Sequence, residues 1–218
     1  MIELLKKYIL KKYNTISFDI FDTLIERDVD TPSDIFYIVG SYILGVKNAD
    51  QFRNDRINAE KKARQLKTNG EVNLNDIYLN LPKKYDKCRD ELFNTEIETE
   101  IRMCHAKKNM NLFYNEMVNN NKKIFLISDM YLSEKIIKSM LDKCNLHGYK
   151  KIYISNEYGI NKVSGDLFLK VIDTENIDIK KHLHIGDSIR ADLIGAYKAG
   201  IHSLHIGRKN RLVRLFHK

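Results

Sequence analysis

The chain has 218 residues, of which 43% are hydrophobic and 30% charged, so we expect one large domain or a core with an insertion and exclude wholesale disorder. Two prolines, ten glycines and no tryptophan exclude collagen-like and low-complexity architectures. The 37 basic and 29 acidic side chains give a net charge of +8, which suits nucleic acid, a membrane surface or a phosphorylated small molecule as partner.

Membrane and secretory segments are not expected. No stretch approaches the roughly 18–20 apolar residues of a spanning helix, and four lysines interrupt the N-terminal residues MIELLKKYILKKY. The three cysteines, Cys88, Cys104 and Cys144, form no CxxC pair, so we interpret them as free thiols of a reducing compartment. A cytoplasmic location follows as an expectation.

The first strand is predicted at residues 15–18 (TISF), a short apolar run that ends in the acidic segment DIFDTLIERD. Residues 26–121 show helical periodicity, and we expect no strand there. Asn73 is predicted to cap a short helix over 74–81, and residues 86–120 form one long helix or two with a break near Lys107. The acidic run at 96–100 is interpreted as a solvated helix face.

From residue 122 onward, apolar strands alternate with helices. The strands are KKIFLIS, KIYIS, HLHIG and HSLHIG, and the helices cover 133–144, 165–176 and 191–200. This alternation predicts an α/β fold with a Rossmann-like parallel sheet. We expect a core domain of residues 1–25 and 122–218 and an all-helical cap of residues 26–121, inserted after the first strand. The last part of the final cap helix could instead belong to the core domain, and the sequence leaves these two assignments open.

Polar side chains gather at the predicted strand ends, where ligands bind in open parallel sheets. The candidate residues are Asp19, Asp22, Ser128, Asp129, Lys162, Asp187 and Asp192. Carboxylates brought this close repel each other unless a cation neutralises them, and their oxygens are natural ligands of Mg²⁺. Together with the lysine, such a metal would attract a phosphoryl group, which a carboxylate can attack.

The order of these motifs resembles the haloacid dehalogenase-like hydrolase superfamily, most members of which are aspartate-dependent phosphatases. The resemblance covers essentially the whole chain. FDIFDTL resembles the nucleophile motif, with Asp19 as nucleophile, and GDSIRAD resembles the acidic metal motif. FDIFDTL and SDMYL are also similar to a subgroup found with bacterial capsule and polysaccharide biosynthesis proteins.

The resemblance implies a role for each matching residue. Ser128, Asp129 and Lys162 would bind the substrate phosphate, and Lys162 would also pair with the nucleophile. Mg²⁺ would be held by Asp19, by the backbone carbonyl of Phe21, and by Asp187 with the support of Asp192.

One position departs from the phosphatase pattern: Phe21 stands two residues after Asp19, where most of these phosphatases carry an aspartate as general acid and base. A positioned proton donor contributes typically 10²–10⁴-fold. Asp22 is the first candidate to replace it. Asp129, His105 and an amine on the substrate itself are the other candidates.

We expect a Mg²⁺-dependent phosphatase that hydrolyses a small phosphorylated metabolite through an aspartyl-phosphate. A sugar, polyol or amino-alcohol phosphate of capsular polysaccharide synthesis is the suggested substrate. One alternative is a 2-haloacid dehalogenase-type hydrolase, whose members also lack that aspartate but typically lack the metal-binding GD followed by a distal Asp. The other is a catalytically degenerate phosphate-binding domain.

Nucleic acid and membrane are not expected as partners, and the oligomeric state is left open. His182, His184, His202 and His205 are interpreted as structural or surface residues rather than a zinc site. The basic residues Arg208, Lys209, Arg211 and Arg214 are interpreted as a solvated terminus.

Overall fold

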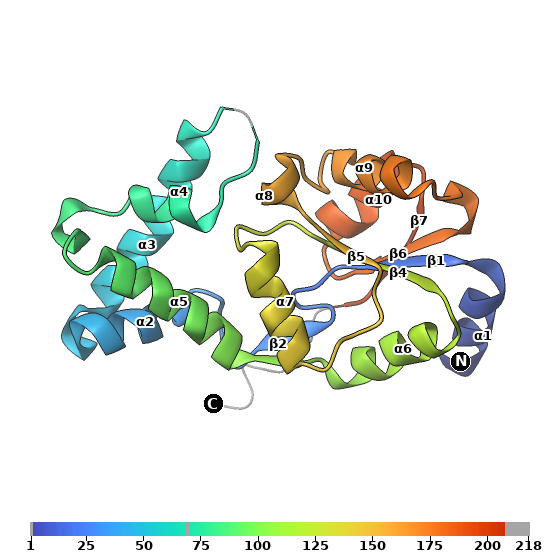
Figure 1. The fold of residues 1–218 in the computed structure, drawn as a ribbon, viewed down its shortest axis with the longest axis horizontal. Helices are drawn as coiled ribbons and strands as arrows, with labels where there is room; N and C mark the ends of the chain where they lie inside the picture. Colours follow the sequence, from blue (N-terminus) through green and yellow to red (C-terminus); the bar gives the residue numbers. More distant parts are fainter. Residues whose placement is uncertain (1, 69, 208–218) are drawn as a thin grey trace.

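Five parallel strands form the central sheet in the computed structural model, which describes residues 2–68 and 70–207. Their order is β5-β4-β1-β6-β7. The bounds are β1 (Thr15–Phe18), β4 (Lys123–Ser128), β5 (Lys151–Ile154), β6 (His182–Gly186) and β7 (His202–His205). The predicted α/β fold with a parallel sheet is therefore confirmed (Figure 1).

Apolar side chains cover both faces of this sheet, as expected for parallel strands that alternate with helices. One face packs against α1 (Ile2–Lys12), α6 (Lys108–Asn119) and α7 (Glu134–Lys143), and the other against α9 (Asp166–Glu175) and α10 (Gly195–Lys198). The alternation along β4 shows the division, because Leu126 belongs to the first core cluster and Phe125 and Ile127 to the second.

The helical excursion lies beside the sheet, on the left in Figure 1. It contains α2 (Asp34–Leu44), α3 (Val46–Leu66), α4 (Leu74–Leu79), the 3₁₀ turn η1 (Lys83–Tyr85) and α5 (Arg89–Met103). The Asn73 side chain accepts a hydrogen bond from the Asp76 amide, so the predicted N-cap of the short helix is confirmed. Helix α6 instead packs on the sheet, with the Tyr114 ring 5.4 Å from that of Phe18.

The expectation of no strand between residues 26 and 121 was wrong. Strands β2 (Ile25–Arg27) and β3 (Cys104–Ala106) pair antiparallel where the chain leaves the sheet and returns to it. Three residues are too short to show a strand period, and their conformation depends on the pairing of segments far apart in sequence. The same pairing separates α5 from α6. Residues 86–120 therefore contain two helices with a break near Lys107, which is the second of the two predicted alternatives.

Two of the three glutamates in the acidic run of α5, Glu96 and Glu100, are buried and only Glu98 is exposed, which corrects the second expectation for this region. Glu96 is fully buried and accepts hydrogen bonds from Arg56 Nε and Nη2 at 2.9 and 2.7 Å and from the Tyr78 hydroxyl at 2.8 Å. Glu100 accepts from Arg27 Nε at 2.6 Å. The two ion pairs join α3 and β2 to α5, and the Tyr78 hydroxyl joins α4 to α5.

Smaller differences concern helix ends. The expected helix over 191–200 is a π-helical turn, η3 (Ile189–Ile194), followed by α10. Two further short elements are α8 (Ser155–Tyr158) and η2 (Ile179–Lys181).

The basic residues from Arg208 to Arg214 lie outside the described residues. Within the described part of the chain, no helix combines the length and the apolar character needed to cross a bilayer.

Two of the three cysteines come together although they are 40 residues apart in sequence. The Sγ atoms of Cys104 and Cys144 lie 3.9 Å apart, within hydrogen-bond distance and without a disulfide, and Cys88 is also a free thiol.

Candidate active site

The site begins at the carboxyl end of β1, the central strand of the sheet. The Asp19 amide donates to the Ile185 carbonyl at 2.9 Å, which continues the β1–β6 ladder by one residue. A turn follows in which Asp22 has φ of 59° and Leu24 N–H returns to the Ile20 carbonyl. This turn brings the Thr23 hydroxyl to Asp19 Oδ2 at 3.0 Å, so one carboxylate oxygen is oriented locally.

Lys162 reaches the other oxygen of the same carboxylate from the loop between α8 and α9. Its Nζ lies 2.6 Å from Asp19 Oδ1 and 2.6 Å from Asp192 Oδ1, and only 2% of the residue is exposed. Its backbone N–H donates to both oxygens of Asp129, at 2.9 and 3.1 Å. Asp129 at the end of β4 therefore fixes the loop that delivers the lysine.

The loop after β6 supplies the remaining carboxylates. Oxygen atoms of Asp19, Asp187 and Asp192 all lie within 4.8 Å of one another, and the three residues are buried. The Ser188 amide donates to Asp192 Oδ2 at 2.8 Å. Gly186 is required for this approach, because a Cβ atom there would lie 2.3 Å from the Asp192 carboxyl carbon.

The charges of this cluster do not balance, since three carboxylates surround one ammonium. Burial, with the charges of Asp192 and Asp187, outweighs Lys162 and raises the pKa of Asp19 from 3.8 to about 7. Burial acts against the charge of Lys162, but Asp19 and Asp192 dominate and raise the pKa of that ammonium. Burial likewise opposes ionisation of Asp192, yet Lys162 and His184 lower the pKa of its carboxyl.

A divalent cation fits this site. Carboxylate oxygens are the hard ligands that Mg²⁺ prefers, and these three converge from the ends of β1 and β6. A bound cation would favour the ionised form of Asp19, whose pKa is raised first by burial and then by the charges of Asp192 and Asp187. Asp19, Asp187 and Asp192 are the residues that would hold it.

The other predicted site residues are placed as follows. Ser128 is buried at the end of β4, next to β1, and therefore at the same edge of the sheet. Phe21 pairs with Ile25 as an isolated bridge, and the Arg27 guanidinium lies 4.5 Å from the centre of its ring. His105 lies on β3, half exposed, with Nε2 3.8 Å from Glu26.

Asp22 lies in the left-handed turn after Asp19, where its carbonyl accepts a hydrogen bond from Lys107 Nζ at 2.7 Å. Lys107 in turn precedes α6, so the segment by which the chain returns to the sheet contacts the turn that carries the predicted acid.

Sequence reasoning did not include His184 in the site. Its Nε2 lies 3.1 Å from Asp192 Oδ1, and its Nδ1 lies 2.9 Å from the Ser17 hydroxyl. The alternation in HLHIG places His182 and His184 on one face of a buried strand, and that pattern is the signal that would have found them.

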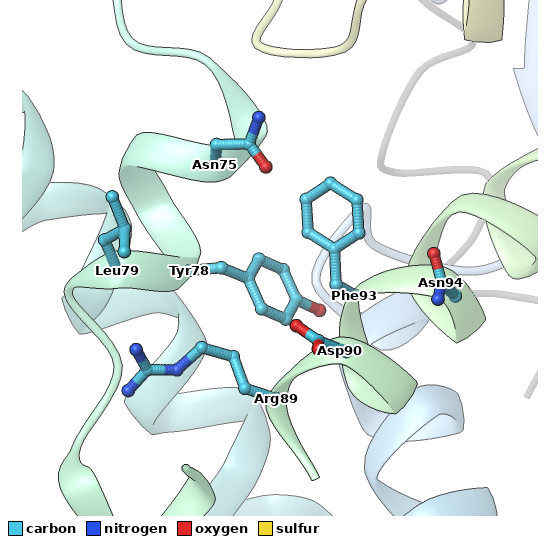
Figure 2. A pocket seen from close by; sticks show the side chains of 7 residues that line it. All are labelled: Asn75, Tyr78, Leu79, Arg89, Asp90, Phe93 and Asn94. Atoms are coloured by element: carbon cyan, nitrogen blue, oxygen red, sulfur yellow. The ribbon is translucent and has the colours of Figure 1, made fainter.

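A separate pocket of about 460 Å³ lies between α4 and α5, away from the carboxylates. Figure 2 shows the rings of Tyr78 and Phe93 at its centre, with Arg89 and Asp90 from the start of α5 beside them. None of the predicted site residues lines it.

Comparisons with known proteins show which family and which solved structures this chain is similar to. The profile of a family described as haloacid dehalogenase-like hydrolase matches residues 37–206. No curated protein matches in sequence. Among solved structures, an L-2-haloacid dehalogenase from Xanthobacter autotrophicus with chloropropionic acid covalently bound is 10% identical, with a TM-score of 0.63 over 92% of this chain and 80% of that one.

A second structural neighbour is the HAD-hydrolase YfnB from Bacillus subtilis, solved bound to magnesium. It is 16% identical, with a TM-score of 0.61 over 94% of this chain and 98% of that one. At identities of 10% and 16%, the two neighbours support the fold alone. The family assignment rests on the profile, which matches residues 37–206 and so covers most of the chain. The chain belongs to the haloacid dehalogenase-like hydrolase family.

Proposed function

We propose that this hydrolase is a Mg²⁺-dependent phosphatase that acts through an aspartyl-phosphate on Asp19. The observation that carries the proposal is the cluster of Asp19, Asp187 and Asp192 around Lys162. Three convergent carboxylates and an ammonium suit a metal-bound phosphoryl group. In the same proposal Ser128 and Lys162 bind the phosphoryl oxygens.

The first chemical step is attack on phosphorus by a carboxylate oxygen of Asp19. A P–O bond forms to Asp19 as the ester P–O bond breaks, and the departing alcohol takes a proton. Both carboxylate oxygens are already oriented, by Thr23 and by Lys162, and each retains a lone pair for the attack. Bound Mg²⁺ would neutralise negative charge on the phosphoryl oxygens.

In the second step, water cleaves the acyl-phosphate, which releases inorganic phosphate and regenerates the Asp19 carboxylate. A base must remove a proton from this water, and an acid must supply one to the leaving alcohol. Asp22 is our proposal for this acid and base. Asp129 is a weaker candidate, because both of its oxygens accept the Lys162 amide.

The proposed substrate is a small phosphorylated metabolite: a sugar, polyol or amino-alcohol phosphate. The likeness of FDIFDTL and SDMYL to proteins of capsule and polysaccharide biosynthesis supports a place in that process. The cap of residues 26–121 would exclude water and select the leaving group. A metabolite partner rather than nucleic acid or membrane, and a cytoplasmic location, belong to the same proposal.

The second candidate function is displacement of halide from a 2-haloacid by the Asp19 carboxylate. Two observations favour it: Phe21 at the position of the missing acid, and fold neighbours described as haloacid dehalogenases. Attack on carbon with departure of halide needs no proton donor and no divalent cation. The clustered carboxylates favour the phosphatase, because without a cation they would repel an anionic substrate.

One experiment separates these functions. The protein is assayed for phosphate release from a panel of phosphorylated metabolites with Mg²⁺ or EDTA, and for chloride release from 2-chloropropionate. We expect phosphate release that requires Mg²⁺ and is lost in Asp19→Asn, while the exposed control Asp173→Asn on α9 keeps it. Chloride release in EDTA would favour the dehalogenase. Binding of Mg²⁺ and beryllofluoride without turnover of any substrate would indicate a degenerate domain.

A further inference from the structure

A chain of polar side chains runs through the core beneath the carboxylate cluster. The β1–β6 register pairs Ser17 with His184 and Thr15 with His182, and Ser17 and both histidines are fully buried. Apart from Thr15, the side chains that pack around them are largely apolar, and the centre of the Phe168 ring of α9 lies 4.7 Å from that of His184. Polar groups in such a layer are costly unless they bond to one another.

The contacts form a continuous series. The Ser17 hydroxyl lies 2.8 Å from His182 Nε2 and 2.9 Å from His184 Nδ1. His184 Nε2 lies 3.1 Å from Asp192 Oδ1, the same oxygen that Lys162 contacts at 2.6 Å. The series therefore ends at the ammonium that pairs with the predicted nucleophile.

The partners assign a direction to every hydrogen bond. A carboxylate only accepts, so His184 Nε2 carries the proton and its Nδ1 accepts from the Ser17 hydroxyl. The Ser17 oxygen must then accept from His182 Nε2–H, which leaves His182 Nδ1 without a hydrogen. That Nδ1 has no hydrogen-bond partner among the described residues, so no contact there conflicts with this direction.

Both histidines are neutral in this arrangement. In the assignment above each ring carries a single hydrogen, on Nε2, and burial lowers the pKa of His182 to about 3. A neutral His184 has one N–H only, and Asp192 receives it.

We propose that His184 is a positioning residue whose Nε2–H holds the Asp192 carboxylate in the orientation that keeps Lys162 Nζ on Asp19. This role in catalysis rests on the proposed function. Asp192 has two anchors besides the lysine: Ser188 N–H on Oδ2 and His184 on Oδ1. With His184 removed, only one anchor remains, so the carboxylate can rotate and the lysine moves with it.

The test uses three variants of the full chain. His184→Leu removes both polar contacts, whereas His184→Gln keeps an N–H near the position of Nε2. His182→Gln is the matched control, since His182 is equally buried on the same strand but contacts Ser17 rather than any site residue. The change in the melting temperature of His182→Gln shows how much stability is lost when a buried histidine that does not contact the site is replaced.

With p-nitrophenyl phosphate and Mg²⁺, we expect kcat of His184→Leu to fall ~10–100-fold, the scale of a displacement of about 1 Å, with KM little changed. His184→Gln should recover most of that loss, and His182→Gln should lose stability but keep kcat. Unchanged kcat in a folded His184→Leu, or an equal fall in His182→Gln, would overturn the proposal.

A second measurement needs no turnover. In ¹H–¹⁵N spectra of lysine-labelled protein, the buried Lys162 ammonium should give a signal that shifts in His184→Leu and stays in place in His182→Gln. An unshifted Lys162 signal in a folded His184→Leu refutes the positioning role. Absent phosphate release by the wild type together with the expected shift would count against the proposed function alone.

Discussion

The raised pKa of Asp19 predicts that the metal-free protein is destabilised as the pH rises. The folded state binds this proton more tightly than the unfolded state, because the carboxyl titrates at about 7 instead of 3.8. Stability is therefore lost as the pH rises above 3.8, and the loss is complete above about 7. At about 1.4 kcal/mol per unit of pKa, the full cost is on the order of 4 kcal/mol, of which roughly 3 develops between pH 5 and 8.

Asp19→Asn is the perturbation that isolates this cost. It removes the titrating charge while leaving Lys162 paired with Asp192. The comparison is needed because the lowered pKa values of His182 and His184 act in the opposite sense: below pH 6.5 the unfolded histidines take up protons that the folded ones do not. Since both proteins carry these histidines, their contribution cancels in the difference.

The assay is urea unfolding of both proteins in EDTA at several pH values from 5 to 8, repeated with saturating Mg²⁺. In EDTA, the free energy of unfolding of Asp19→Asn minus that of the wild type should grow by about 3 kcal/mol over this range. Mg²⁺ should reduce the difference, because it stabilises the ionised cluster. A difference that does not change with pH in EDTA would refute the raised pKa of Asp19.

Three further predictions concern other parts of the structure. Gly186→Ala should reduce phosphate release at least ~100-fold, because the added Cβ would displace the Asp192 carboxylate and so misplace the reacting groups. A folded and fully active variant would contradict this. Glu96→Gln should destabilise the protein by about 3 kcal/mol in urea unfolding, the lower end of the cost of breaking a buried pair, since Glu60 at 3.3 Å still faces the buried Arg56 charge. Phe21→Asp should raise kcat for alkyl phosphates but not for p-nitrophenyl phosphate, whose leaving group needs no proton; equal effects on both would exclude a leaving-group acid at this position.

Much of the fold was predictable because each core strand is a short apolar run with a polar end. In TISF and KKIFLIS the pattern is local, and parallel strands bring such ends to one edge whatever the details of packing. This explains why Asp19, Lys162 and Asp192 could be proposed as neighbours before any contact was known. The structure brings them within hydrogen-bond distance.

The helical excursion α2–α5 was harder to predict because its buried charges look like surface charges in sequence. Glu96 and Glu100 follow a helical period that fits a solvated face equally well. Only the packing of α3 and β2 against α5 supplies Arg56 and Arg27 as partners, and these partners make burial of the two glutamates possible.

The sequence by itself determined the parallel sheet, the inserted helices and the residues that the strand ends present, because these depend on local apolar runs and on the geometry of parallel strands. The tertiary structure decided what each polar group bonds to. Asp129 holds a backbone amide, and His184 reaches Asp192 across the core. A hydrogen bond depends on the distance and angle between residues far apart in the chain, and those are defined only when the elements pack.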